Sequence, residues 1–185
     1  VAGTGANFDD GVEAAFVRNG KTRKLDTQGT QWGGAYGVNN LGVVSGSVPV
    51  NGGALFGGLD LGATATIGMA PMQLTAPLEE NSNGYDIADD GTVVGLSFDV
   101  GYSQDRTKAF VWTPSQGMQV LATTSPFTYS RANAISSDGR VIAGWNDNDF
   151  GRSGVIWRNR VPMDVQDDVG GRVGDVPDFA AGATG

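Results

Sequence analysis

The chain of 185 residues contains no cysteine and no histidine. Without thiols it cannot form disulfides or thiolate metal sites. Without imidazole it cannot use a Ser-His-Asp triad, a histidine general base or a histidine metal ligand. What remains is the chemistry of carboxylates, hydroxyls, amides and the backbone. Because no catalytic motif replaces the missing residues, we expect the protein not to be an enzyme.

Basic residues and long apolar runs are also scarce. The 12 Lys and Arg against 20 Asp and Glu give a net charge of −8. This balance argues against a nucleic-acid partner, which needs clustered basic side chains, and the basic run at 18–24 is interpreted as a solvated hairpin tip. No stretch approaches the roughly 18 consecutive apolar residues that a membrane span requires, and the first residues do not resemble a signal peptide. Both ends read as interrupted strand patterns, so we expect a piece of a longer chain.

Glycine is abundant instead. There are 30 glycines, while hydrophobic residues make up 39% and charged residues 17% of the chain. Both fractions lie below their usual ranges, and small polar residues fill the gap. Such a composition is typical of many short strands joined by turns.

A sequence repeat is the main organising signal. Similar strand-like segments surround Gly3, Gly46, Gly95 and Gly144, which are spaced by 43, 49 and 49 residues. Acidic turns, Asp-Asp-Gly at 89–91 and Ser-Asp-Gly at 137–139, precede the last two segments. A near-constant period of this length indicates a repeat architecture.

The order of segments inside each unit also recurs. In the third unit, Ala-Phe-Val-Trp at 109–112 leads to Met-Gln-Val-Leu at 118–121 and then to Ala-Asn-Ala-Ile-Ser at 132–136. The first unit repeats this order through an Asn-Gly turn at 19–20, the preferred dipeptide of a two-residue hairpin. In the second unit the best matches are Ala-Thr-Ile-Gly at 65–68 and Met-Gln-Leu at 72–74, after a Gly-rich insertion at 51–62.

Four short strands in a period of about 45 residues predict an all-β fold of the β-propeller type. A single blade cannot bury both faces of its sheet, so neighbouring blades are expected to stack and share a core. We expect one repeat domain over 1–185, with blades at 1–42, 43–91, 92–139 and 140–185, in an array that further repeats or a partner chain complete. An open array would leave unpaired strand edges, which favours self-association.

The run Lys-Ala-Phe-Val-Trp-Thr at 108–113, followed by Gly-Met at 117–118 and Ala-Ile-Ser-Ser-Asp-Gly-Arg-Val at 134–141, resembles the HAF-repeat family of bacterial extracellular proteins. Lys108 stands where that repeat has histidine. The resemblance implies secretion or display at the cell surface. It carries over no catalytic residue.

Acidic residues offer one candidate site. Asn146, Asp147, Asn148 and Asp149 precede Gly151 in a predicted loop with oxygen ligands at alternate positions, as in calcium loops. The later bidentate acid of such a loop is missing, so Asp147 and Asp149 are interpreted either as calcium ligands or as Asx turns at a blade tip. No other cofactor is expected.

Aromatic residues offer the other candidate site. Trp112 and Trp157 occupy matching repeat positions and are predicted to pack in the core. Other aromatic residues lie in or beside polar segments and are predicted to form a binding surface: Trp32, Tyr102, Phe127, Tyr129, Trp145 and Phe150. Rigid aromatic faces among small polar residues suit contacts with glycans or proteins.

Three functions are consistent with these patterns. The first is a secreted or cell-surface interaction module that binds a glycan or a protein through blade-tip loops. The second is a structural protein that assembles by pairing incomplete arrays. The third is a carbohydrate-active enzyme that uses two loop carboxylates as acid and base.

Overall fold

The computed structural model of the chain describes residues 2–7, 11–18, 21–24, 34–50, 59–66, 72–74, 81–98, 107–148 and 151–165. All the elements of secondary structure in these residues are β-strands. The strands form three four-stranded sheets and one three-stranded sheet, in which each strand pairs antiparallel with the next one along the chain. The predicted all-β class is therefore confirmed.

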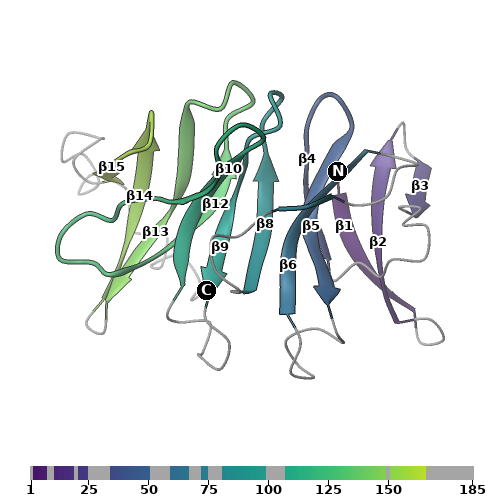
Figure 1. Cartoon of the computed structure of the whole chain (residues 1–185), viewed down its shortest axis with the longest axis horizontal. Coiled ribbons are helices and arrows are strands. Elements are labelled where there is room, and N and C mark those ends of the chain that lie inside the picture. Colours follow the sequence, from purple (N-terminus) through teal and green to yellow (C-terminus); the bar gives the residue numbers. More distant parts are fainter. Residues whose placement is uncertain are drawn as a thin grey trace, which may run out of the picture.

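The sheets follow one another in chain order and lie side by side (Figure 1). The first holds β1 (Ala2–Asn7), β2 (Gly11–Arg18) and β3 (Lys21–Lys24). The second holds β4 (Gly34–Val38), β5 (Val43–Val50), β6 (Leu59–Thr66) and β7 (Met72–Gln73). The third holds β8 (Asn81–Ile87), β9 (Val93–Phe98), β10 (Lys108–Thr113) and β11 (Gly117–Val120). The fourth holds β12 (Tyr129–Ile135), β13 (Val141–Asn148), β14 (Gly151–Arg158) and β15 (Val161–Asp164).

The second, third and fourth sheets each begin one strand earlier than the predicted sequence unit. The strand at 129–135 falls at the end of the unit predicted at 92–139, yet it pairs with β13 in the fourth sheet. The reason is the length of the connections. A short acidic turn joins β12 to β13 as a hairpin, whereas the longer segment at 121–128 carries the chain from the third sheet to the fourth.

The register predicted for the second unit is wrong by three residues. Val44 pairs with Ala65 in the second sheet as Val93 pairs with Trp112 in the third, so Ala65 occupies the tryptophan position. The sequence match instead makes Ala65 equivalent to Ala109, the alanine that begins the Ala-Phe-Val-Trp run. Strand β6 begins at Leu59, inside the segment predicted as an insertion, because its pairing with β5 extends as far as Val50 opposite Leu59.

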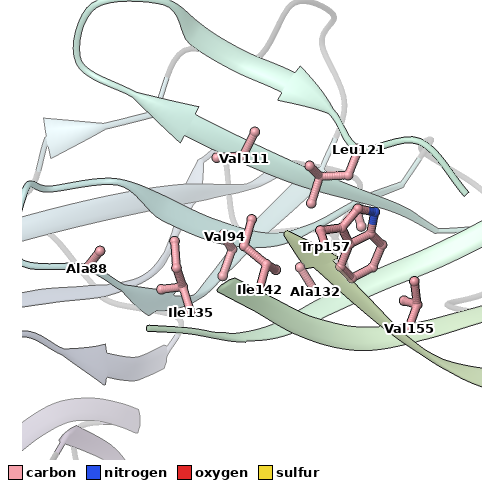
Figure 2. Packing of buried hydrophobic residues seen from close by; sticks show 10 residues of the cluster. Ala88, Val94, Val111, Leu121, Ala132, Ile135, Ile142, Val155 and Trp157 are labelled. Carbon is pink, nitrogen blue, oxygen red and sulfur yellow. The ribbon is translucent and has the colours of Figure 1, made fainter. Parts of the chain in front are cut away.

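The hydrophobic core lies between neighbouring sheets. Figure 2 shows the cluster between the third and fourth sheets, where Trp157 is completely buried beside Leu121 and Ile142. Its indole Nε1 donates a hydrogen bond to the backbone oxygen of Ala122 at 2.7 Å. Trp112 is also buried. It lies between the second and third sheets, in a cluster that includes Leu74 and Phe110. The predicted core role of both tryptophans is confirmed.

Repeated turns also join the sheets to one another. In the turn after β4, Asn40 donates its backbone N–H and its side-chain Nδ2 to the carboxylate of Asp89, at 2.9 and 2.8 Å. Asn39 Nδ2 donates to the backbone oxygen of Ala88 at 3.0 Å. Both contacts connect residues 49 positions apart, so successive repeats touch at equivalent places.

The acidic turns at 89–91 and 137–139 differ from the two-residue hairpin type that the Asn-Gly dipeptide predicts at 19–20. Gly91 and Gly139 take positive φ angles of 86° and 74°, while the aspartates before them do not. The described residues that form a turn with two positive φ angles are instead Asn159 and Arg160, at 50° and 69°, between β14 and β15. In the acidic turns, the glycine alone needs the left-handed conformation.

In the part of the chain described here, no helix is long and apolar enough to cross a membrane.

Candidate binding surface

A β-bulge interrupts the first strand of three successive sheets. The pairing of β4 skips Tyr36, that of β8 skips Tyr85, and that of β12 skips Asn133. A bulged residue has no direct partner on the next strand, and its side chain is re-aimed relative to the pleat. These first strands also contact one another in series, β4 with β8 and β8 with β12. The bulges therefore bring equivalent positions of neighbouring repeats close together.

The two tyrosines of this series touch. The ring centroids of Tyr36 and Tyr85 are 5.1 Å apart, and the ring planes are tilted by 52°. Tyr36 lies over Gly34 of its own strand, where an added Cβ would collide with the phenol ring. The side chain of Tyr36 remains 42% exposed. Gly34 thus makes room for an aromatic ring that presents part of its surface to solvent.

Arg131 of β12 continues this series of contacts into the fourth sheet. Its guanidinium carbon lies 4.1 Å from the ring centroid of Tyr85, a cation–π contact. Burial raises the pKa of Tyr85 above its ordinary value near 10, although the positive charge of Arg131 acts in the opposite direction. Tyr85 is consequently a neutral phenol at physiological pH, able to donate a hydrogen bond but not to act as a base.

A second arginine–aromatic pair, formed by Trp145 of β13 and Arg152 of β14, lies beside Arg131. Trp145 of β13 stands directly opposite Arg131, so the two side chains share one face of the sheet. The guanidinium of Arg152 lies 3.9 Å from the Trp145 ring centroid. Its Nε and Nη2 both donate to Oδ2 of Asp147, at 2.9 and 2.7 Å.

These contacts make one continuous surface that crosses three sheets. We call it the aromatic–arginine strip; its members are Tyr36, Tyr85, Arg131, Trp145 and Arg152. Every member is partly or largely exposed. Aromatic rings and guanidinium groups alternate along most of its length. Such groups can interact with other molecules by stacking and by donating hydrogen bonds.

Two of the residues predicted to bind a ligand lie at this surface. Trp145 is a member of the strip, and Tyr129 of β12 stands opposite Asp147 on the same face. Both are partly buried and belong to strands rather than to the predicted loops. Trp32, Tyr102 and Phe150 lie outside the described residues.

The predicted calcium loop is strand for most of its length. Asn146, Asp147 and Asn148 belong to β13, which pairs Asn148 with Gly151. The segment forms the end of a hairpin, and the Asp147 carboxylate accepts hydrogen bonds from Arg152. Asp149 lies outside the described residues. Within those residues, no group of three or more acidic side chains is placed to hold a metal ion.

Sequence reasoning missed Tyr36, Tyr85, Arg131 and Arg152. A signal for the tyrosines was present, because both precede a turn in corresponding positions 49 residues apart, the spacing of the repeat. No comparable signal marks the arginines. Arg131 meets Tyr85 because two sheets pack against each other, which the sequence pattern does not specify.

No protein-family model matches the chain, and no curated protein matches it either. Solved structures do resemble it. TolB from Acinetobacter baumannii aligns with a TM-score of 0.56 and 12% identity over 83% of this chain. A putative TolB from Agrobacterium tumefaciens aligns with a TM-score of 0.54 and 10% identity, also over 83%. The chain spans 36% and 60% of these two proteins, respectively. At such identities the likeness concerns the fold alone, which is β-propeller-like.

Proposed function

We propose that the chain is a non-catalytic interaction module, built as a β-propeller-type array in which each of the four sheets is one blade. It binds a glycan or a protein through the aromatic–arginine strip. By its resemblance to HAF-repeat proteins, it acts outside the cell or at the cell surface. The fold likeness to TolB supports the propeller-type arrangement.

The strip is the single observation that carries this proposal. Its groups are available for binding, because Tyr36 is 42% exposed and the guanidinium groups of Arg131 and Arg152 already lie against aromatic rings. Side chains held in this way lose little conformational entropy when a ligand stacks on them. A linear glycan fits best, because sugar rings present apolar faces to aromatic rings and hydroxyl groups to polar side chains.

The proposal is tested by glycan-array binding of the wild type and of Tyr36→Ala and Trp145→Ala. Val120→Ala is the matched control, since Val120 is an exposed apolar residue (56%) outside the strip. We expect at least about a tenfold loss of binding in the two strip variants, as for truncation of an aromatic hot-spot residue, and none in the control. Equal binding by all four proteins would reject the strip as the recognition surface.

A second candidate function is self-assembly, which the outer face of the fourth sheet favours. In the third sheet, Val94 and Val111 pair across the strands and are buried at the interface with the fourth sheet. Ala143 and Ile156 form the equivalent pair in the fourth sheet, but Ala143 is exposed and Ile156 is only partly buried. The position that a neighbouring sheet covers in one repeat is therefore uncovered in the next. A second copy of the chain, which contains sheets of the same repeat, is the proposed occupant.

This candidate predicts a dimer or a larger oligomer in sedimentation analysis. Ala143→Arg should shift the population to monomer, because it places a charge where the repeat buries an apolar side chain. Val120→Arg, on an exposed strand of the third sheet, should leave the mass unchanged. A monomer at all concentrations would reject self-assembly, while the binding role of Tyr36 and Tyr85 would still stand.

A further inference from the structure

The two arginines of the strip differ in one respect that points to a ligand. Arg152 lies against Trp145 and also donates two hydrogen bonds to a carboxylate, that of Asp147. Arg131 lies against Tyr85 in the same way, but no carboxylate of the described residues pairs with it. Its Nε is buried and has no hydrogen-bond acceptor.

An unpaired guanidinium beside an aromatic ring is an incomplete arrangement. A buried N–H group without an acceptor costs free energy, because it has lost its hydrogen bond to water and forms none within the protein. Nε of Arg131 is enclosed, so an incoming carboxylate would meet the two terminal Nη groups, whose spacing matches its two oxygens. A ligand carboxylate would pair with Arg131 through its two Nη groups, whereas Asp147 pairs with Arg152 through Nε and Nη2.

We infer that Arg131 is the carboxylate-recognition residue of the strip and that the ligand is an acidic glycan containing uronic acid. This inference rests on the proposed binding function and assigns its ligand class. Beyond Tyr85, which Arg131 contacts, the strip offers the exposed surface of Tyr36, which suits the apolar face of a sugar ring. Two residues along β12 from Arg131, the exposed bulged residue Asn133 has an amide that can both donate to and accept from sugar hydroxyls.

The charge of the chain makes such binding diagnostic. With a net charge of −8, the protein does not attract an anionic ligand through its overall field. Binding of an acidic oligosaccharide would therefore report a local site rather than a non-specific electrostatic effect.

The test is a calorimetric titration with oligogalacturonate and with the same oligosaccharide after reduction of its carboxyl groups, preceded by an array of other uronate oligosaccharides. We expect the wild type to bind the acidic form at least about tenfold more tightly than the reduced form. Arg131→Gln should lose about 10- to 100-fold in affinity for the acidic form alone, and Arg131→Lys should lie in between, because lysine keeps the charge but not the planar fork. Arg140→Gln is the matched control, since the side chain of Arg140 is 77% exposed in a turn outside the strip.

Each outcome has one meaning. If both forms of the oligosaccharide bind equally and Tyr36→Ala weakens both, the carboxylate inference fails and the proposed binding function survives. If no uronate oligosaccharide binds, or if an acidic peptide binds in its place, the assignment to an acidic glycan is overturned. Thermal melting of Arg131→Gln, compared with that of the wild type, verifies that any loss of affinity does not reflect unfolding.

Discussion

Trp112 and Trp157 occupy the same register position in successive sheets, but their indole nitrogens have different surroundings. Nε1 of Trp157 donates to the backbone oxygen of Ala122, whereas Nε1 of Trp112 is buried without a partner. Both rings fill the space between two sheets. The pair thus separates the contribution of packing from that of a hydrogen bond.

Replacement of each tryptophan by phenylalanine should reveal this difference. Trp157→Phe leaves a carbonyl oxygen without its donor and should cost about 1–2 kcal/mol more in unfolding free energy than Trp112→Phe. Either alanine variant should cost about 3–5 kcal/mol, because each leaves a large cavity. Urea denaturation of the four variants measures these differences. Equal costs for the two phenylalanine variants would show that the hydrogen bond contributes nothing.

The raised pKa of Tyr85 predicts a dependence of stability on alkaline pH. Burial stabilises the neutral phenol in the folded chain, so its pKa lies above the value near 10 that it has in the unfolded chain. The stability that this difference provides is complete below about pH 10 and is lost as the pH rises through the folded-state pKa. We expect the melting temperature of Tyr85→Phe to fall less steeply above pH 10 than that of the wild type. Parallel curves would contradict the assignment.

At the scale of elements, the first hairpins of the third and fourth sheets depend on a close approach of two strands. A Cβ added to Gly144 of β13 would collide with the backbone oxygen of Arg131 on β12, and Gly95 of β9 meets that of Asn83 in the same way. Each glycine pairs with the residue just before a bulge: Gly95 pairs with Gly84, before Tyr85, and Gly144 pairs with Ala132, before Asn133. The repeating glycine therefore serves the geometry of the strip as well as the sheet.

Gly144→Ala should destabilise the fold by about 1–3 kcal/mol, since a backbone atom cannot move aside as a flexible side chain can. Gly151→Ala is the matched control, because a Cβ at that strand position would meet nothing within 4 Å. Its expected effect lies within about 0.5 kcal/mol. Denaturant midpoints compare the two variants. Similar midpoints would mean that the strands can separate without cost.

At the scale of the whole molecule, polar contacts between sheets couple the repeats. The carboxylate of Asp86 accepts the backbone N–H of Ile87 within the third sheet and that of Ile135 in the fourth, each at 2.9 Å. In repeat proteins, stability is the sum of intrinsic terms and of interfaces between neighbours. Asp86 therefore acts on the interface as well as on its own strand.

Asp86→Ala should lower the unfolding free energy by about 1.5–3 kcal/mol and reduce the denaturant slope, because the fourth sheet would separate before the rest. Asp138→Ala is the control. The Asp138 carboxylate accepts from Ser136 and Arg140 inside its own turn, so its loss should leave the slope unchanged. An unchanged slope for Asp86→Ala would indicate that other contacts hold the two sheets together.

The sequence determined the strands, because short apolar runs bounded by glycine and aspartate have few alternatives to β-structure. It also determined the period and the buried tryptophans, since recurrence at one register position marks a shared packing role. The division into sheets was not determined in this way, because a repeat has no inherent starting point and connection length decides which strands pair.

The tertiary structure alone decided which side chains meet at the strip. Tyr36, Tyr85 and Arg131 come from three sheets, and their contacts depend on how the bulged first strands pack against one another. A pattern along one chain specifies which face of a strand is buried, because that depends on local alternation. The distance between groups on separate sheets depends on packing across the whole array, so it became visible only in three dimensions.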